Sequence, residues 1–281
     1  MSDKEVSITV DSASIVPMID KNQTQLIFQR HCNYDRKNGK LHPESVEDQK
    51  SIMQSFITDL KNSFSTEDLQ NTYFLFTSSN TVSDNDFKRC IETTNIAMES
   101  IKQFLKERHI STSHVINLNE DSNYNGQIHE SRQLVEPKMF TDGTGYYDFL
   151  SKKYNGINVD FWTDFEEDLS KEKREELGAE GPEQIVERAV CYIQILQRYA
   201  SYFHKKYPNS RLVIWNGTHY DLISPLVKQR ILHLEKSFWL KVDYCGGISL
   251  VIDELNGVIA NVNGARYPFD FGEIKQPHRH F

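Results

Sequence analysis

The sequence predicts an α/β fold, a three-layer sandwich whose mostly parallel central sheet carries helices on both faces, plus a C-terminal β-hairpin. Short apolar runs of strand-forming residues alternate along the chain with amphipathic helical patterns, and that order is typical of parallel sheets covered by helices. Near the end, residues 248–253 and 258–262 flank the turn-forming segment Glu254-Leu-Asn-Gly257. This arrangement indicates the hairpin.

Four buried strands are expected, at 25–29, 72–77, 113–117 and 211–215. Apolar residues at helical spacing predict helices over about 43–63, from 83–86 to about 108, from Gly181-Pro182 past Phe203, and after Asp221 to about 236. Residues 5–10 alternate weakly, which is compatible with an edge strand or an ordered arm.

Prolines and a capping pattern mark the helix starts. Pro43 stands where the first helix would begin, a position that suits proline. Ser83-Asp84-Asn85-Asp86 resembles a capping box. Pro225 is expected in the first turn of the last helix, because proline within a helix removes a hydrogen bond.

The length of 281 residues fits one large domain or two small ones. The chain shows no internal repeat and no low-complexity linker, so we predict a single domain over 1–281. Residues 118–180 are charged and punctuated by glycine, with a short aromatic helix near 146–153. In a compact domain such a stretch usually covers a site, so 118–180 is expected to be a variable insertion or lid.

The charge balance excludes two classes of partner. There are 40 acidic and 32 basic residues, which gives a net charge of −8. Nucleic acids and anionic membranes attract broad positive fields, so neither is expected as a partner. No run approaches the ~18 consecutive apolar residues of a membrane helix, and the polar start Met1-Ser2-Asp3-Lys4-Glu5 is unlike a signal peptide.

The cysteines suggest a compartment. Cys32, Cys90, Cys191 and Cys245 are widely spaced and form no CxxC pair. This usage favours a reduced cytosolic environment, with neither a disulfide framework nor a zinc ribbon. We therefore expect a cytoplasmic protein.

Charged and imidazole side chains follow the predicted strands where the strands end. Arg30-His31 follows the first strand, Ser78-Ser79 and then Arg89 follow the second, and Thr218-His219 follows the fourth. The segment 131–137, which contains Glu136, lies between the third strand and the next long helix. Ligands of open parallel sheets bind outside the carboxyl ends of the strands, so these side chains are expected to share one rim.

This set of groups suits phosphoryl transfer. Guanidinium groups bind phosphate oxygens in bidentate fashion, and helix N-termini at the same rim add N–H donors. A neutral imidazole is a competent nucleophile near pH 7. A carboxyl group near the leaving oxygen acts as a general acid when burial raises its pKa.

Four segments resemble, in order, the motifs of the histidine phosphatase superfamily, which has the phosphoglycerate-mutase-like fold. They are Phe28-Gln-Arg30-His31, Thr77-Ser-Ser79 with Lys88-Arg89-Cys-Ile-Glu-Thr-Thr94, Leu134-Val-Glu136, and Val213-Ile-Trp-Asn-Gly-Thr218-His219. In that family the first motif is Arg-His-Gly, the second is roughly Ser-x-x-x-Arg-x-x-x-Thr, and the last is a strand ending in His-Gly. The resemblance covers about residues 24–228 and is closest to the phosphatase branch.

The resemblance implies a metal-independent phosphatase that hydrolyses a phosphomonoester through a phosphohistidine intermediate. His31 would be the nucleophile, and Arg30 and Arg89 would hold the phosphoryl oxygens. His219 would complete the phosphate pocket and stabilise charge in the transition state. Glu136 would protonate the leaving alcohol and later activate water. No metal and no other cofactor would be needed, because the arginines and His219 supply positive charge.

The second-histidine position has two candidates. Cys32 and Tyr220 stand where glycine usually follows each histidine of the family. Asn216-Gly217 also mimics a His-Gly motif, so Asn216 competes with His219 for this position. If Asn216 were the equivalent, the fold would carry a non-catalytic binder of phosphate compounds or phosphoproteins.

The sequence also offers more than one candidate for the general acid and for the substrate. Glu130 and Glu120 compete with Glu136 for the role of acid. A phosphoglycerate-mutase-type phosphotransferase is a further alternative. The substrate is expected to be a small-molecule or protein phosphomonoester. The aromatic residues of the insertion would suit an organic leaving group or form a small core; they are Tyr146, Tyr147, Phe149, Phe161 and Trp162. The sequence does not determine the oligomeric state.

Overall fold

The computed structural model describes residues 8–35, 37–82, 86–118, 128–141 and 143–272. Its helices and strands follow in the order β1 (Ile8–Val10), β2 (Thr24–Arg30), β3 (Tyr34–Asp35), β4 (Lys40–Leu41), α1 (Pro43–Ser63), α2 (Thr66–Gln70), β5 (Thr72–Ser79), α3 (Arg89–Glu107), η2 (Thr112–His114), β6 (Ile128–Ser131), η3 (Arg132–Leu134), α4 (Lys138–Thr141), α5 (Tyr146–Lys153), α6 (Val159–Glu167), α7 (Lys171–Glu176), α8 (Pro182–Lys206), β7 (Arg211–Thr218), α9 (Tyr220–Arg230), β8 (Leu240–Val242), β9 (Gly247–Ile252), β10 (Val258–Val262) and β11 (Ala265–Pro268). None of the helices in this described part is long and apolar enough to cross a bilayer.

The main sheet has seven strands in the order β11-β10-β9-β2-β7-β5-β6. β2, β7, β5 and β6 are parallel neighbours. β9 joins β2 antiparallel, and β10 and β11 continue the sheet as antiparallel strands. The predicted α/β class and the C-terminal hairpin are confirmed. The hairpin extends the main sheet next to β2, and β11, a strand not expected from the sequence, lengthens it further.

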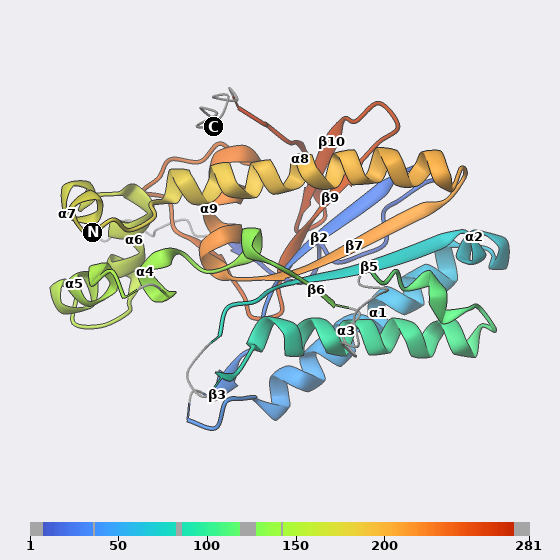
Figure 1. The fold of residues 1–281 in the computed structure, drawn as a ribbon, viewed down its shortest axis with the longest axis horizontal. Helices are drawn as coiled ribbons and strands as arrows, with labels where there is room; N and C mark the ends of the chain where they lie inside the picture. Colours follow the sequence, from blue (N-terminus) through green and yellow to red (C-terminus); the bar gives the residue numbers. More distant parts are fainter. Residues whose placement is uncertain (1–7, 36, 83–85, 119–127, 142, 273–281) are drawn as a thin grey trace, which may run out of the picture.

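Helices cover both faces of the sheet (Figure 1). Ile27, Phe76 and Trp215 belong to the apolar cluster beneath α1 and α3. Their strand neighbours Phe28 and Ile214 belong to the cluster beneath α8 and α9. Successive strand residues point to opposite faces, so the continuous apolar runs of the sequence fill both cores.

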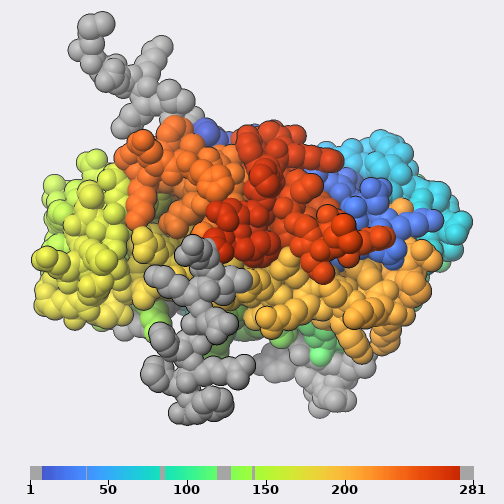
Figure 2. Space-filling model, turned by 90° about the horizontal axis from the view of Figure 1, so that it is seen from above, coloured from blue at the N-terminus to red at the C-terminus, as the bar shows by residue number. Residues whose placement is uncertain are grey.

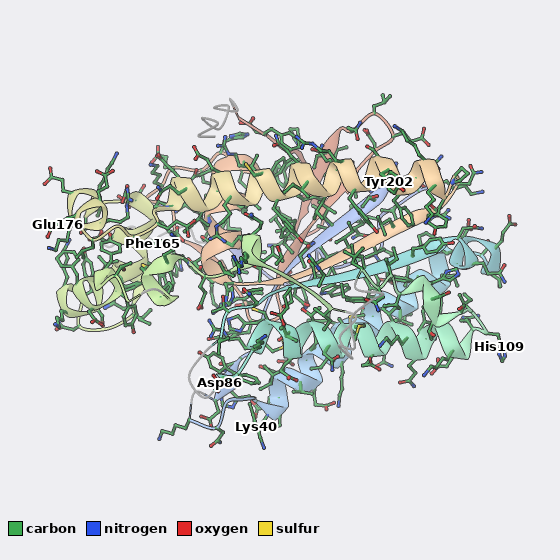
Figure 3. The ribbon with its side chains drawn as sticks, viewed as in Figure 1. Lys40, Asp86, His109, Phe165, Glu176 and Tyr202 are labelled. Carbon is green, nitrogen blue, oxygen red and sulfur yellow. A yellow bond between two sulfur atoms is a disulfide. The ribbon has the colours of Figure 1, made fainter. Side chains whose placement is uncertain are left out.

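The helices α4 to α7, residues 138–176, form a helical lobe at one end of the molecule (Figures 1 and 2). The carboxyl ends of the parallel strands point toward this lobe (Figure 1). Phe161 and Phe165 of α6 are fully buried, and Glu176 marks the outer end of the lobe (Figure 3). The aromatic helix expected near 146–153 is α5. The lobe helices are short, and helices of this length depend on tertiary packing for their stability.

The predicted strand at 113–117 is wrong. Thr112–His114 forms the 3₁₀ turn η2, and Val115 makes an isolated bridge with Phe74. The place beside β5 is taken by β6, where Ile128 pairs with Phe76. Val115 is buried against β5, which accounts for the apolar residue at this position. A short apolar run alone does not distinguish a residue packed against a sheet from a residue in a sheet strand.

The predicted start of the last helix was also wrong. β7 continues to Thr218 and α9 begins at Tyr220, so the expected loop 216–221 is mostly strand and helix. Pro225 consequently lies in the second turn, inside α9, and the helix ends at Arg230 instead of about 236. The missing proline N–H leaves the carbonyl four residues earlier without its helical donor.

The other helix and strand starts are close to the expectation. α1 begins at Pro43, and α8 begins at Pro182. The capping-box residues 83–85 lie outside the described residues, and α3 begins at Arg89. Within the predicted segment 5–10, Ile8–Val10 forms β1 and pairs parallel with β8 in a separate small sheet.

A disulfide joins Cys32 to Cys245, which are 213 residues apart in the sequence. The expectation that the cysteines do not pair was wrong for these two. β2 and β9 are antiparallel neighbours, and Gln29 pairs with Gly247. The segments that carry Cys32 and Cys245 therefore meet at one end of this strand pair. The disulfide ties the residue after His31 to the segment that contains Tyr244.

Candidate active site

A cavity of about 460 Å³ opens at the carboxyl ends of β2 and β7. Arg30, His31, Arg89, Glu136 and Asp221 all line it. A second cavity of about 450 Å³ lies at the opposite end of β2, beside Thr24 and His204. Because arginine, histidine and carboxyl groups converge in the first cavity, we place the candidate site there.

His31 follows the last residue of β2 and is held from both sides. Its backbone N–H donates to the Thr218 carbonyl at 3.0 Å, and its Nδ1 lies 2.7 Å from the Cys32 carbonyl. Since a carbonyl only accepts, Nδ1 carries the proton and Nε2 carries the lone pair. Burial, with the charges of Arg89 and Arg30, lowers the pKa of His31 well below its usual value. The imidazole is therefore neutral at pH 7.

Arg89 is the first residue of α3 and lies at the centre of the site. Its Nε donates to His31 Nε2 at 3.0 Å, its Nη1 donates to the Tyr34 hydroxyl at 3.3 Å, and its Nη2 donates to Glu136. Burial alone would lower the pKa of Arg89, but nearby groups, Glu136 first among them, raise it overall. The guanidinium is therefore charged, buried and directed at His31 Nε2.

Arg30 lines the same cavity but is held differently. Its Nη1 donates to the Val242 carbonyl at 2.5 Å, and its guanidinium lies 3.9 Å from the ring centroid of Tyr244. Its Nε is buried without a hydrogen-bond partner in the described part of the chain. Burial lowers the pKa of Arg30, yet an arginine side chain stays protonated. A charged donor thus remains unsatisfied beside the site.

His219 is the N-cap residue of α9, and its ring centroid lies 5.3 Å from that of His31. Its Nε2 is 2.9 Å from Ser79 Oγ, and its Nδ1 is 3.4 Å from Arg89 Nη2. Burial, followed by the charge of Arg89, lowers the pKa of His219 well below its usual value. The structure therefore brings two neutral imidazoles and a charged guanidinium together, and of these His31 and Arg89 line the cavity.

Asn216 lies away from this cluster. It is fully buried in the middle of β7, where its Nδ2 donates to the Ile27 carbonyl at 2.9 Å. Its Oδ1 accepts from Thr77 Oγ1 at 2.7 Å. Asn216 therefore holds neighbouring strands together, and His219 is the side chain that faces His31.

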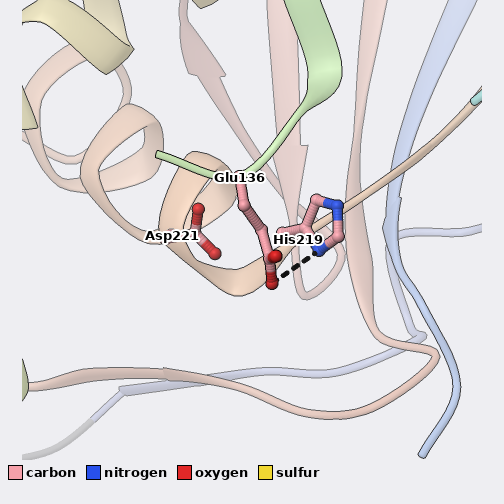
Figure 4. Close-up of side chains that lie close together, drawn as sticks. All are labelled: Glu136, His219 and Asp221. Atoms are coloured by element: carbon pink, nitrogen blue, oxygen red, sulfur yellow. Dashed lines mark ion pairs between the residues drawn. The ribbon is translucent and has the colours of Figure 1, made fainter. Parts of the chain in front are cut away.

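Of the two candidate glutamates that the structure describes, Glu136 reaches the cluster. It follows η3, and its Oε1 lies 3.4 Å from His219 Nδ1 (Figure 4). Glu130 is on β6 and forms a surface ion pair with Lys88 at 2.9 Å. Glu120 lies outside the described residues.

Asp221 belongs to the cluster and was missed in the sequence. It lies in the first turn of α9, is 4% exposed, and faces Glu136 and His219 (Figure 4). Its Oδ2 is buried without a hydrogen-bond partner among the described residues. Burial, and then the nearby charge of Glu136, raise the pKa of Asp221 to about 8. Its position two residues after His219 was the available signal, but sequence alone does not show burial.

The glycine of β7 lets α3 approach closely enough to place Arg89. A Cβ on Gly217 would overlap Thr94 Oγ1 and lie 3.1 Å from the Cys90 carbonyl. Thr93, one turn after Arg89 in α3, accepts a hydrogen bond at its Oγ1 from the Cys32 N–H at 2.9 Å. The start of α3 therefore supports both the guanidinium and the chain segment beside His31.

One group of side chains in the described part of the chain has the spacing of a metal site. Ligand atoms of Glu136, His219 and Asp221 lie within 4.8 Å of one another. However, Arg89 Nη2 donates to the same Glu136 oxygen and lies 3.4 Å from His219 Nδ1. A cation bound here would lie against a buried guanidinium, so the cluster fits an anion better than a metal.

Solved structures that are similar to this chain include a phosphoglycerate mutase and a phosphatase. No protein-family model matches the sequence, and no curated protein matches it. Phosphoglycerate mutase from Bacillus anthracis str. Sterne is similar, with 16% identity and a TM-score of 0.48, over 90% of this chain and 95% of that one. The mycobacterial glucosyl-3-phosphoglycerate phosphatase has 11% identity and a TM-score of 0.41, over 86% of this chain and 100% of that one.

Proposed function

We propose that this protein is a histidine phosphatase that hydrolyses a phosphomonoester through a phosphohistidine at His31, without a metal. The hydrogen-bond pattern around His31 carries the proposal. Nδ1 donates to the Cys32 carbonyl, so the Nε2 lone pair points toward Arg89, 3.0 Å away. A phosphoryl group bound by Arg89 would meet that lone pair, and geometry of this kind supports nucleophilic catalysis.

In the first step His31 Nε2 attacks phosphorus and the bond to the leaving oxygen breaks. Phosphoryl oxygens would compete with Glu136 for the donors of Arg89, which releases the Glu136 carboxyl group to exchange a proton with Asp221. The leaving oxygen takes that proton from Glu136 and departs as an alcohol. Arg30, Arg89 and His219 stabilise the charge on the transferring group.

In the second step water attacks the phosphohistidine, and the bond between phosphorus and Nε2 breaks. Glu136 takes one proton from the water and passes it back to Asp221, so phosphate leaves and both the His31 lone pair and the Asp221 proton are restored. The balance of the two steps is one ester and one water consumed, one alcohol and one phosphate released.

A trapping experiment tests this proposal. Rapid quench of the protein with ³²P-labelled phenyl phosphate is expected to give a phosphoprotein that survives alkali and is lost in acid, with the label on the peptide that contains His31. Phosphate release is expected to be unchanged by EDTA. Turnover that never labels the protein, or a label on another residue, would contradict the mechanism.

Asp221→Asn is expected to alter both activity and its pH dependence. We expect kcat to fall about 10²-fold, the lower part of the range for lost general acid–base catalysis. The wild-type decline in activity near pH 8, caused by the raised pKa of Asp221, should disappear in the variant. The measurement is kcat from pH 5 to 10, with exposed Asp48→Asn on α1 as the matched control.

Asp221→Asn is expected to increase the free energy of unfolding, although it lowers kcat. The unfolded carboxyl group loses its proton near pH 4, whereas folded Asp221 holds it to about pH 8. Between these values the folded state binds more protons, so Asp221 lowers the free energy of unfolding as pH rises. Asp221→Asn is therefore expected to unfold at a higher temperature than wild type at pH 8, with the gain shrinking toward pH 4. Equal melting temperatures at pH 8 would show that Asp221 is not held protonated.

A further inference from the structure

The wall of the site cavity is aromatic. Beyond the charged cluster, the cavity is lined by an aromatic wall, which we define as Tyr34, Phe140, Tyr147, Trp162, Tyr220 and Tyr244. Val82 and Ile157 add aliphatic surface to the lining and are 46% and 39% exposed. Clusters of exposed apolar side chains beside convergent polar groups mark ligand-binding surfaces.

The rings of the wall come from separate parts of the chain and meet. Phe140, Tyr147 and Trp162 belong to α4, α5 and α6 of the helical lobe. Phe140 lies 5.5 Å from Tyr147 and 6.0 Å from Trp162, between ring centroids. Trp162 in turn lies 4.9 Å from Tyr220 at the start of α9. The wall therefore runs without a break from the helical lobe to the residue next to His219.

A buried polar network fixes part of the wall. Glu166 of α6 accepts a hydrogen bond from the Tyr220 hydroxyl at 3.0 Å and from Ser224 Oγ at 2.7 Å. It also forms an ion pair with Lys228 at 2.6 Å, and both partners are almost fully buried. These contacts join α6 to α9, so Tyr220 and Trp162 are held in position before a ligand binds. Such pre-organisation lowers the entropic cost of binding.

The charges around the cavity argue against a second anionic group on the substrate. Among the described residues that line it, the cationic side chains are Arg30 and Arg89. Arg89 faces the nucleophile, and Arg30 is stacked on Tyr244. The acidic residues of the lining are Glu136 and Asp221. A substrate with a carboxylate or second phosphate would meet carboxyl groups and rings instead of a further cation.

We infer that the substrate is a phosphomonoester whose alcohol carries an aromatic ring and no second negative charge, with the ring bound by the aromatic wall. The inference rests on the proposed phosphatase function and deepens it. The phosphoryl group occupies the Arg89 end, and the ring stacks against Trp162 and Tyr147. Ring stacking adds to the burial of apolar area.

A pair of substrates with equally poor leaving groups tests the aromatic wall. 2-Phenylethyl phosphate and butyl phosphate both release a simple primary alcohol, so a difference in kcat/KM reports ring binding and not leaving-group acidity. We expect wild type to prefer 2-phenylethyl phosphate about tenfold or more, and to prefer it over 3-phosphoglycerate by a larger factor. A phosphotyrosyl peptide in the same series distinguishes a protein side chain from a small molecule as the source of the ring.

Two wall variants and one control complete the test. Trp162→Ala and Tyr147→Ala should bring the ratio of the two kcat/KM values close to one, and Trp162→Phe should restore most of it. Tyr202→Ala, on the outer surface of α8 where the side chain is 67% exposed, should leave the ratio unchanged (Figure 3).

The outcomes separate the aromatic wall from the phosphatase proposal. Hydrolysis of both esters with equal kcat/KM, or a preference for 3-phosphoglycerate, overturns the inference and leaves the phosphatase function standing. If no ester is hydrolysed, the phosphatase function fails. In that case calorimetry with 2-phenylethylphosphonate and butylphosphonate decides: tighter binding of the aromatic compound supports the wall, and equal binding overturns it.

Discussion

His31→Ala is expected to lower kcat for phosphomonoester hydrolysis by at least about 10⁴-fold, because the covalent route then has no nucleophile. The remaining binding groups cannot replace the lone pair of Nε2, which lies beside Arg89. The measurement is phosphate release from phenyl phosphate under saturating conditions. The ³²P label of the trapped phosphoprotein should vanish in the same variant.

The control for this prediction is another imidazole. His129 is exposed on the edge strand β6, so His129→Ala removes the same group away from the cavity. It is expected to keep wild-type kcat. A His31→Ala protein that is folded, as judged by its melting curve, and still turns over at the wild-type rate would rule out His31 as the nucleophile.

Arg89→Ala is expected to reduce kcat/KM by about 10³-fold, the upper range for loss of one transition-state donor. This guanidinium contacts His31 and Glu136 at once, and Arg89 is 5% exposed. Arg89→Lys keeps the charge but not the planar set of donors, so it should recover only part of the activity. Inhibition by vanadate should weaken in both variants.

The control for Arg89→Ala is an arginine at the other end of α3. Arg108 is the exposed C-cap residue of α3, so Arg108→Ala makes the same charge change far from Arg89. It should leave kcat/KM and vanadate inhibition unchanged. Since Arg89→Ala leaves the Glu136 carboxylate without a partner it has in wild type, melting curves are needed for both variants. A folded Arg89→Ala protein with wild-type kcat/KM would remove the guanidinium from the mechanism.

The residues changed in these two predictions, His31 and Arg89, were both identified from the sequence. Arg30-His31, Arg89 and His219 follow strands or begin helices in the order expected from the apolar pattern. The apolar pattern was sufficient to group these side chains, because the carboxyl ends of parallel strands lie along one edge of the sheet. This holds for any length of the loops between the strands. Placing these side chains needed only strand order and direction.

Other features could not be predicted because they depend on contacts between distant segments. Asp221 is held protonated by burial and by Glu136, which is 85 residues away in the sequence. The exclusion of Asn216 from the site required knowing that β7 extends to Thr218. The pairing of β6 with β5 could not be predicted, because residues 118–180 show no clear hydrophobic period in the sequence.

By itself the sequence determined the α/β class, the rim and the order of its charged groups, because apolar periodicity and strand direction are local properties of the chain. The tertiary structure alone decided the Cys32–Cys245 disulfide, the proton on Asp221 and the aromatic wall. A disulfide requires two sulfur atoms to meet, a raised pKa requires exclusion of water, and a wall requires rings from several helices to touch. Each of these conditions is set by packing between segments that are far apart in the chain.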